Sequence, residues 1–229
     1  MTPHPEFLPE TKSVFLVDDH PMVREQLTQL IDNQPDLHVC GEARDVSEAL
    51  EGIERQLPDI AVVDLNLRKS SGLDLIKDLK ARGLRIPILV LSMHDEGLYA
   101  ERALRAGAMG YVSKQENTRE ILMAIRQVLG GGIHVSPGLA GKLVMNAIGG
   151  NLDQNSSPVS KLADRELEVF QLIGRGCGTR KIAESLGLSV KTIESYRARI
   201  KDKLNLEDGV QLLQRAVQWV ESYDDGKST

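Results

Sequence analysis

The stretch FLVDDHPMV, residues 15–23, decides how the first half of this chain folds. A short apolar run, typical of a buried strand, ends in the adjacent carboxylates Asp18 and Asp19, and His20-Pro21 follows almost at once. Acidic residues are common helix N-caps and proline is favoured in the first helical turn, so a loop that opens a helix would explain this order. Taken alone, the two like charges at the end of a buried strand favour that loop, and the rest of the chain favours a different interpretation.

Further apolar runs follow, separated by segments of helical period, and several are too continuously apolar for half-exposed strands. The alternation of five strands with five helices predicts an α/β fold, a doubly wound parallel five-stranded sheet of the flavodoxin-like kind. Ligands of such sheets bind at the carboxyl ends of the strands. The expected strands are SVFLV (13–17), LHVCGEA (37–43), DIAVVDL (59–65), IPILVLS (86–92) and GYVS (110–113). The expected helical stripes include Val23, Leu27, Leu30 and Ile31, and also Ile121, Ile125, Val128 and Leu129.

The composition is that of a globular protein, with 41% hydrophobic and 27% charged residues in a chain of 229. Its two cysteines, Cys40 and Cys177, follow no metal-ligand or disulfide pattern and suggest a reducing compartment. The Pro-rich, acidic start is unlike a signal peptide, and no apolar run approaches the roughly 20 residues of a membrane helix. These features predict a soluble, cytoplasmic protein with no membrane partner.

The charge is unevenly distributed along the chain. Residues 1–158 hold 16 Lys and Arg against 22 Asp and Glu, residues 159–204 hold 10 against 6, and residues 205–229 hold 2 against 5. A basic island in an acidic chain predicts an anionic partner for that island alone. The stretch before it is rich in Gly, Asn, Ser and Pro and is typical of a linker, with one short helix expected over 139–148.

Three carboxylates should meet at neighbouring strand ends, because Asp64 ends the third strand as Asp18 and Asp19 end the first. The fourth strand ends in Ser92 and the fifth is followed by Lys114. Carboxylates this close repel one another unless a cation lies among them, and oxygen ligands favour Mg²⁺, which takes only one or two carboxylates. The remaining acid is then available for chemistry.

That chemistry can be phosphoryl transfer, because a carboxylate can attack phosphorus and form an acyl phosphate. A metal ion, an ammonium and a hydroxyl can share the charge on the transferred group, and Asp64, Lys114 and Ser92 fit the nucleophile, the ammonium and the hydroxyl. Taken singly, Lys114 could be a solvated loop lysine and Ser92 a helix cap. Five such residues at adjacent strand ends favour a common site.

Residues 13–132 resemble the receiver domain of a two-component response regulator, through VDDH, VVDLNL, LSMHD and AGAMGYVSK. The resemblance implies that Asp64 accepts phosphate from a sensor histidine kinase. It also implies that Asp19, Asp64 and the backbone carbonyl of Asn66 hold Mg²⁺, with Asp18 acting through the metal's waters. Tyr111 matches the aromatic switch position, which swings inward as Ser92 moves toward the phosphate. Under this interpretation, the adjacent acids tolerate each other because a divalent cation joins them to Asp64.

The second motif is TRKIAESLGLSVKTIESYRARIKDKL, residues 179–204. A helix ends at Gly187 and Ser189 caps the next, which is the pattern of a helix-turn-helix whose second helix enters the major groove of double-stranded DNA. An ordinary helical hairpin remains the alternative. A helical wheel places Ile193, Tyr196, Ile200 and Leu204 on the buried face. The candidate DNA-binding residues are Lys191, Thr192, Glu194, Ser195, Arg197, Ala198 and Arg199, with Glu194 suited to cytosine, Lys191 to guanine, Ala198 to a thymine methyl and Arg197 to phosphate or an internal salt bridge.

Residues 159–224 resemble the LuxR/NarL-type DNA-binding domain, an all-α four-helix unit, so nearly the whole chain resembles a NarL/FixJ-type response regulator. Ala163, Lys181 and Tyr196 depart from the usual Thr, Glu and His, and Ala163 removes a helix cap. The resemblance implies a homodimer upon phosphorylation, with a dimer contact through the last helix, Val210 to Val220, where Trp219 could serve either that contact or the core. The expected organisation is a tail (1–12), the receiver (13–132), a linker with a short helix (133–158), the helix-turn-helix domain (159–224) and a tail (225–229).

Two other classes of function compete with a phosphorylation-controlled, non-enzymatic transcription regulator. A phosphatase of the haloacid dehalogenase type also uses an aspartate at a strand end, but it needs a second acid where Asn66 stands, and it needs a cap domain. A protein-interaction adaptor with a vestigial helix-turn-helix would show no salt-sensitive DNA binding.

Overall fold

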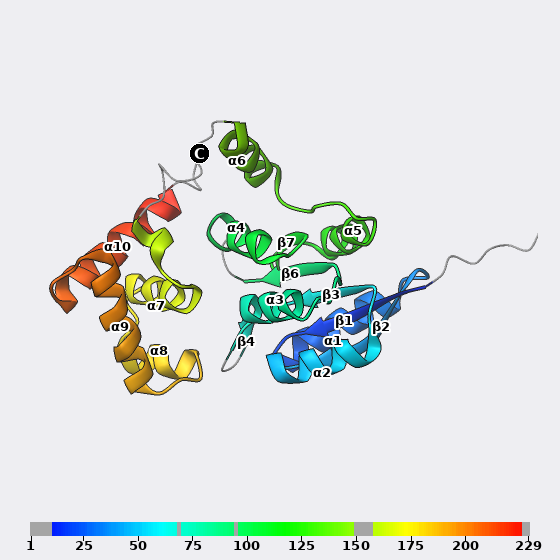
Figure 1. Cartoon of the computed structure of the whole chain (residues 1–229), viewed down its shortest axis with the longest axis horizontal. Coiled ribbons are helices and arrows are strands. Elements are labelled where there is room, and N and C mark those ends of the chain that lie inside the picture. The colour runs from blue at the N-terminus through cyan, green and yellow to red at the C-terminus, as the bar shows by residue number, and fades with distance from the viewer. Residues whose placement is uncertain (1–10, 68–69, 94–95, 149–157, 226–229) are drawn as a thin grey trace, which may run out of the picture. The chain divides into compact units, whose positions relative to one another are not determined.

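The computed structural model describes residues 11–67, 70–93, 96–148 and 158–225. They belong to two compact units, which divide the chain between Leu143 and Val144 (Figure 1). The predicted tail at 1–12 lies mostly outside the described residues, as do much of the polar linker stretch and most of the C-terminal tail.

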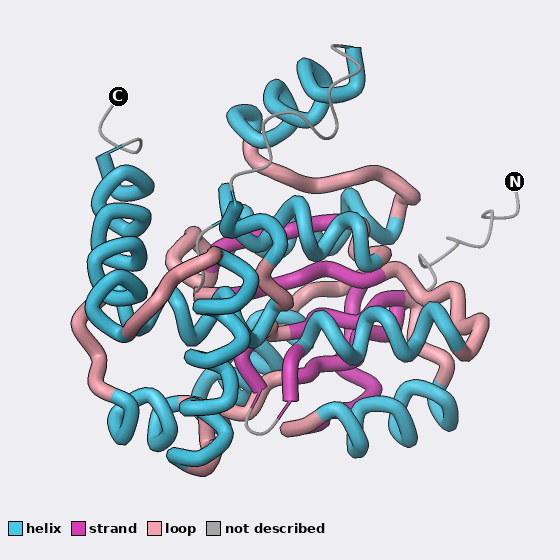
Figure 2. The backbone as a smooth tube through the Cα atoms, turned by 60° about the vertical axis from the view of Figure 1, so that its left-hand side comes forward, coloured by secondary structure: helices cyan, strands magenta, loops and turns pink. Residues whose placement is uncertain are grey.

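The first unit contains the five predicted strands in one parallel sheet, shown in magenta in Figure 2. Its strand order is β2-β1-β3-β6-β7, so the direction of winding reverses between β1 and β3, and a ligand site is expected there. The sheet confirms the doubly wound α/β prediction. Its strands are β1 (Lys12–Val17), β2 (Leu37–Ala43), β3 (Ile60–Val63), β6 (Ile88–Ser92) and β7 (Gly110–Ser113).

Helices cover both faces of the sheet because successive side chains of a strand point to opposite sides. Val14 and Leu16 of β1 belong to the core cluster that includes Ile31 and Ile125 from helices of one layer. Phe15 points the other way, and a Cβ built on Gly52 of α2 would lie 2.5 Å from its ring. The five helices are α1 (Pro21–Asp32), α2 (Val46–Gln56), α3 (Gly72–Ala81), α4 (Glu96–Ala106) and α5 (Thr118–Leu129).

A short hairpin after the third strand was not predicted. Strands β4 (Asn66–Leu67) and β5 (Ser70–Ser71) pair antiparallel, and each is too short for side-chain periodicity to reveal. The Ser71 hydroxyl then caps α3 by accepting from Leu73 N. Gly72 is required next, because a Cβ there would overlap the carbonyl oxygen of Asp64. The hairpin therefore brings backbone directly against the end of β3.

The second unit is helical in its described part, as predicted, and Phe170, Ile193, Leu212 and Ala216 are buried in its core. Gly187, at φ +62°, makes the tight turn between the two motif helices, because a left-handed backbone favours glycine. Trp219 packs against Phe170 with ring centroids 5.6 Å apart. The helices are α7 (Asp164–Gly174), α8 (Thr179–Ser185), α9 (Val190–Leu204) and α10 (Gly209–Asp225), preceded by the 3₁₀ turn η1 (Pro158–Lys161).

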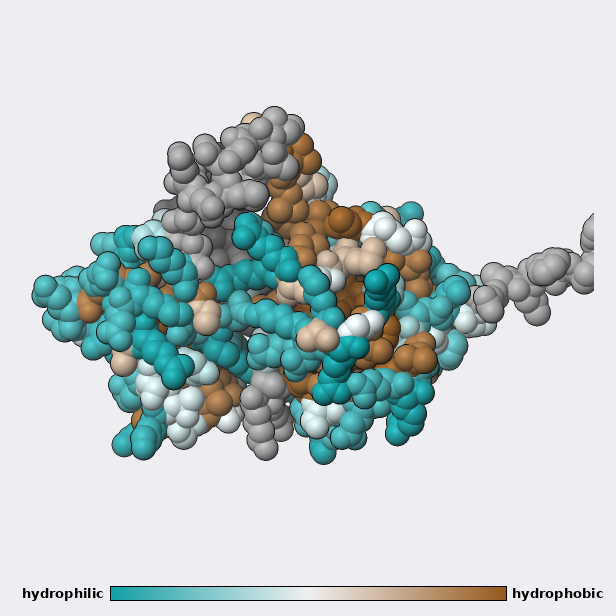
Figure 3. All heavy atoms as spheres, in the orientation of Figure 1, coloured by the Kyte–Doolittle hydropathy of each residue, from teal (hydrophilic) through white to brown (hydrophobic). Residues whose placement is uncertain are grey.

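The short helix expected over 139–148 is present as α6 (Pro137–Ile148), which begins two residues earlier than predicted. It is strongly apolar, and Val144 and Met145 are 54% and 71% exposed. The brown surface in the upper part of Figure 3 belongs in part to this helix.

Candidate functional site

The carboxyl ends of four parallel strands bring the predicted acidic residues, hydroxyl and lysine together. Asp18 follows β1, Asp64 follows β3, Ser92 ends β6 and Lys114 follows β7. Asp18 and Asp64 are each 3% exposed and Ser92 is fully buried, which is rare for polar side chains unless a partner compensates them.

Lys114 is that partner for the two buried carboxylates. Its Nζ donates to Asp18 Oδ2 and to Asp64 Oδ2, both at 2.6 Å, and its side chain is only 8% exposed. The Lys114 amide also donates to the carbonyl of Ser92 at 2.9 Å, which ties the lysine to the end of the neighbouring strand. The ammonium is therefore placed by backbone pairing and lies between the first and third strand ends.

Burial and charge act in opposite directions on the pKa values of this site. Burial raises the pKa of Asp64 to about 6, and the Lys114 ammonium opposes this rise. Burial by itself would lower the pKa of Lys114, but the carboxylates of Asp64 and Asp18 outweigh it, and the pKa of Lys114 is raised. At neutral pH the site holds an ammonium beside a carboxylate that is mostly ionised.

The loop after β1 positions Asp18 and Asp19. Asp18 Oδ1 accepts from the His20 amide at 2.8 Å, and His20 Nδ1 lies 3.2 Å from that oxygen and 2.8 Å from Asp19 Oδ1. Arg24 of α1 donates from Nη1 to the Asp18 carbonyl at 2.6 Å. Its Nε lies 3.2 Å from Glu42 Oε2. Neither His20 nor Arg24 was predicted from the sequence as a residue of this site. The one available indication was their spacing, because His20 and Arg24 lie one helical turn apart at the start of α1.

The donor atoms here fit a hard divalent cation. One ligand atom each from Asp18, Asp19, His20 and Asp64 lies within 4.8 Å of the others. Three of these groups are carboxylates, the ligand type that Mg²⁺ prefers. Asn66 stands close by, since its amide donates to Asp64 Oδ1 at 3.3 Å. The predicted metal-ligating residues are therefore neighbours in the structure.

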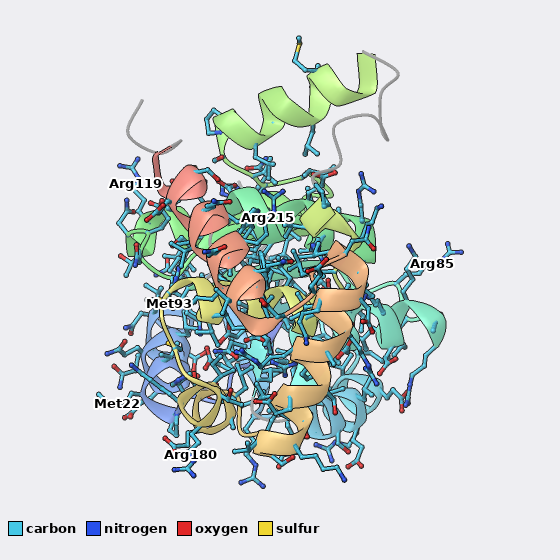
Figure 4. The ribbon with its side chains drawn as sticks, turned by 90° about the vertical axis from the view of Figure 1, so that its left-hand side faces the viewer. Met22, Arg85, Met93, Arg119, Arg180 and Arg215 are labelled. Carbon is cyan, nitrogen blue, oxygen red and sulfur yellow. The ribbon has the colours of Figure 1, made fainter. Side chains whose placement is uncertain are left out.

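An open groove of about 480 Å³ leads to these groups. Apolar side chains from α1, β6 and α5 line one part of it, and polar residues line another, namely His20, Gln26, Asp64, Asn66, Lys114, Glu116 and Thr118. Met93, which is 63% exposed and labelled in Figure 4, lies on its rim. A reacting group could approach Asp64 from solvent along this groove. The apolar lining comprises Val23, Leu27, Leu30, Leu91 and Ile121.

Tyr111 lies on β7 with its side chain only 1% exposed. The ring is therefore already in an inward position in this structure. Its amide donates to the carbonyl of His134 at 2.8 Å, so a segment that follows α5 contacts this strand directly.

The predicted DNA-reading helix is α9, and Tyr196 and Leu204, which the wheel places on the buried face, are only half-buried. Ile193 and Ile200 are buried, and the Ser189 hydroxyl caps the helix by accepting from the Thr192 amide at 3.0 Å. Arg197 is 23% exposed and 3.9 Å from Glu194, a distance at the limit of an ion pair. Among the candidate DNA-binding residues, Lys191, Glu194, Ser195, Ala198 and Arg199 are exposed, whereas Thr192 and Arg197 are half-buried.

The first helix of the motif adds a basic group to the surface of this unit. Arg180 at the start of α8 is exposed and points outward in Figure 4. Much of the surface over α9 and α10 is hydrophilic, as Figure 3 shows in teal.

Ala163 provides no side-chain cap, but the reciprocal bond of a capping box is present. Glu166 Oε2 accepts from the Ala163 amide at 2.8 Å and from Lys203 Nζ of α9 at 2.6 Å. Glu166 is only 3% exposed, whereas the Lys203 side chain is 39% exposed, so this link between the start of α7 and the end of α9 is shielded from solvent on the carboxylate side. The helix start is stabilised by one half of a capping box.

Comparisons with known proteins match both halves of the chain to known domain families. The model of the response regulator receiver domain matches residues 14–126, and the model of bacterial regulatory proteins of the luxR family matches residues 160–216. BvgA from Bordetella pertussis is 33% identical over 203 residues, which cover 89% of this chain and 95% of that protein. The chain belongs to the LuxR-type response regulators.

A further relative is similar to most of this response regulator, and a solved structure is similar to part of it. The oxygen regulatory protein NreC from Staphylococcus carnosus is 32% identical and covers 90% of this chain and 96% of its own length. The crystal structure of a LuxR-family two-component response regulator from Aurantimonas matches with a TM-score of 0.56 and 34% identity. That match covers 61% of this chain and 99% of the other. The response regulator is thus a transcription regulator of the two-component type, with a receiver and a LuxR-type helix-turn-helix.

No helix in the described part of this response regulator is both long enough and apolar enough to cross a membrane.

Proposed function

We propose that Asp64 is the phosphoacceptor of this response regulator and that its phosphorylation by a sensor histidine kinase controls DNA binding. The observation that supports this most directly is the buried triad in which the Lys114 ammonium contacts both Asp18 and Asp64 at 2.6 Å. In the reaction, an Asp64 carboxylate oxygen attacks the phosphorus of a phosphohistidine. The new O–P bond forms as the N–P bond breaks, and the imidazole leaves with its electron pair.

Lys114 and Ser92 would donate hydrogen bonds to the oxygens of the phosphoryl group on Asp64. The lysine already contacts an Asp64 oxygen, so its ammonium is placed to neutralise the added negative charge of an acyl phosphate. Ser92 ends the strand beside β7, from which it can donate its hydroxyl to a phosphoryl oxygen. Low exposure at both residues strengthens these interactions, because water competes less in a buried site.

Mg²⁺ would be held by the carboxylates of Asp19 and Asp64 and by the backbone carbonyl of Asn66, with Asp18 acting through bound water. When bound, the ion would neutralise charge on the transferred group. The protein itself holds these acids together at the carboxyl ends of the strands. Arg24 would fix the loop after β1, which bears Asp18 and Asp19.

Tyr111 would follow the state of Ser92. A phosphoryl group that draws Ser92 inward frees space next to it, and a buried Tyr111 ring can occupy that space. The structure has the ring inward, so the proposal predicts that the unphosphorylated chain also samples an outward ring.

The output would be a homodimer that binds double-stranded DNA through α9. Lys191, Glu194, Ser195 and Ala198 would face bases, and Arg197, Arg199 and Thr192 would contact the backbone or flank the reading surface. The exposed Leu213 (44%) on α10 gives an apolar position for contact with a second copy.

This assignment makes the chain a regulator whose only chemistry is its own phosphorylation and dephosphorylation, working beside DNA in the cytoplasm. We assign residues 13–132 to the receiver, 133–158 to the linker and 159–224 to the DNA-binding domain, with tails at each end.

The test combines a small phosphodonor such as acetyl phosphate with Mg²⁺, and compares the wild-type chain with Asp64→Asn. Phosphorylated wild type should become dimeric in light scattering and bind a selected DNA site more tightly than the untreated chain. Asp64→Asn should neither dimerise nor bind the DNA site more tightly after the same treatment. Excess chelator should abolish both changes in the wild type. Equal dimerisation of Asp64→Asn under the same treatment would contradict the proposal.

A further inference from the structure

The segment Ile133–Leu139 runs from the loop after α5 into the first turn of α6, and at His134 it lies along the edge of the sheet. The His134 amide donates to the Met109 carbonyl at 3.0 Å, and the His134 carbonyl accepts from the Tyr111 amide at 2.8 Å. These two bonds form a parallel bridge to Gly110, so the segment extends the sheet beyond β7. A Cβ on Gly110 would lie 3.0 Å from the His134 carbonyl oxygen, which shows how closely the two backbones approach.

Side chains from two helices also bind this segment. Gln127 of α5 donates from Nε2 to the Ile133 carbonyl at 2.7 Å, and its Oε1 lies 2.9 Å from His134 Nδ1. Glu96, the first residue of α4, accepts from the Ser136 amide at 2.7 Å. The His134 side chain, in a residue only 8% exposed, also lies with Nε2 3.4 Å from Glu120. These bonds fix the segment to β7, α4 and α5 at once.

The same segment begins α6. The Ser136 hydroxyl accepts from the Leu139 amide at 3.2 Å, which caps the helix, and Leu139 is 6% exposed. One serine therefore joins α4 to α6, because its amide binds Glu96 and its hydroxyl caps the helix that leads into the linker.

We infer that Ile133–Leu139 is a strap through which a change at the acidic site reaches α6 and, through the linker, the DNA-binding domain. The inference rests on the proposed function, because it takes Asp64 as the phosphoacceptor. Ser92 ends β6, the chain then enters α4 at Glu96, and Tyr111 lies on β7. The strap has a hydrogen bond to Glu96 and another to Tyr111, so movements of either element act on the same short segment.

The arrangement predicts which contacts transmit the change and which do not. Glu96 and Gln127 bind the strap but belong to neither the phosphorylation site nor the DNA-reading helix. Glu101, also on α4, instead pairs with Arg105 at 2.7 Å on the surface and serves as the matched control. A variant that loses the strap contacts should still accept phosphate, yet transmit less of its effect.

The experiment uses the full chain with acetyl phosphate and Mg²⁺, and it compares wild type, the double variant Glu96→Ala/Gln127→Ala, and Glu101→Ala. Phosphate incorporation is measured by intact mass, and DNA affinity is measured with and without phosphate on a site selected by the wild type. The double variant should incorporate phosphate as the wild type does. Its DNA affinity with phosphate should be less than about twofold higher than its affinity without phosphate. Glu101→Ala should keep the wild-type gain.

Hydrogen exchange gives a second measurement on the wild type. Phosphorylation should change the exchange rates of the Tyr111, His134 and Ser136 amides severalfold, with little change in the α1–β2 region. Unchanged exchange in the strap, together with a wild-type gain in the double variant, would overturn the strap while leaving Asp64 as the phosphoacceptor. A wild type that takes up no phosphate would overturn both proposals.

Discussion

The buried ammonium of Lys114 should be a large stabilising group of the receiver when no divalent cation is bound. Replacing it in Lys114→Met keeps an unbranched apolar stem but removes the charge that contacts Asp18 and Asp64 at 2.6 Å. The side chains of Asp18 and Asp64 are 4% and 2% exposed, so solvent can compensate neither of them fully. Removing one partner of a buried ion pair costs about 3–5 kcal/mol, and we expect a loss of that size at pH 8.

The loss should depend on pH and on Mg²⁺. Because Lys114 opposes the burial that raises the pKa of Asp64 to about 6, the variant's Asp64 should have a higher pKa still. A carboxyl with a raised folded-state pKa is favoured in its protonated form, so the variant's deficit should shrink as the pH falls toward 5 and grow as it rises. Mg²⁺ at about 100 times its dissociation constant would restore about 2.7 kcal/mol.

Urea unfolding in chelator measures this loss. Far-UV circular dichroism follows both units, whereas the fluorescence of Trp219, the single tryptophan of the chain, follows the second unit alone. The part of the dichroism transition that the fluorescence does not share therefore belongs to the receiver. Lys12→Met is the matched variant, because Lys12 pairs with Asp59 at 3.2 Å and is 44% exposed, so its loss should be about 1 kcal/mol or less. A Lys114→Met deficit no larger than that of Lys12→Met would refute the reasoning.

Other predictions address the sheet edge, the acidic loop and the DNA. Hydrogen bonding from Ser13 holds the pKa of Asp59 below its usual value, so Asp59→Asn should lose about 1 kcal/mol in urea unfolding at pH 7, and the deficit should vanish as the pH falls through that lowered pKa. Arg24→Gln should weaken Mn²⁺ binding about tenfold in an electron paramagnetic resonance titration, with unchanged affinity counting against a positioning role. Arg199→Ala should weaken binding to all DNA sequences and reduce the salt slope by about one, as fluorescence anisotropy would show. Glu194→Ala should instead reduce the discrimination between bases at one position of the site by about 1–3 kcal/mol. An unchanged profile of selected sites would refute the assignment of Glu194 as a base-reading residue.

Much of the receiver could be predicted from sequence because its signals are local. Continuous apolar runs such as IAVV at 60–63 indicate buried parallel strands, and such strands necessarily bring their carboxyl ends to one edge. The neighbourhood of Asp18, Asp64 and Lys114 then follows from the topology. The same holds for α9, where Ile193 and Ile200 mark the buried face by their spacing alone.

What could not be predicted depends on contacts between residues far apart in the chain. The hydrogen bond from Arg24 to the Asp18 carbonyl depends on the rotamer of a long side chain, which the sequence does not determine. Arg24 of α1 also pairs with Glu42 of β2. The strap at His134 pairs with β7 through backbone bonds, and the sequence around it has no strand periodicity. Two-residue strands such as β4 and β5 are likewise too short to leave a pattern.

The central claim is that Asp64 accepts the phosphoryl group, and intact-mass measurement tests it most directly. With acetyl phosphate and Mg²⁺, the wild-type chain should gain about 80 Da, the mass of one phosphoryl group, and excess chelator should prevent the gain. Asp64→Asn should gain nothing under the same conditions. A donor-dependent and Mg²⁺-dependent gain that persists undiminished in Asp64→Asn would contradict the account.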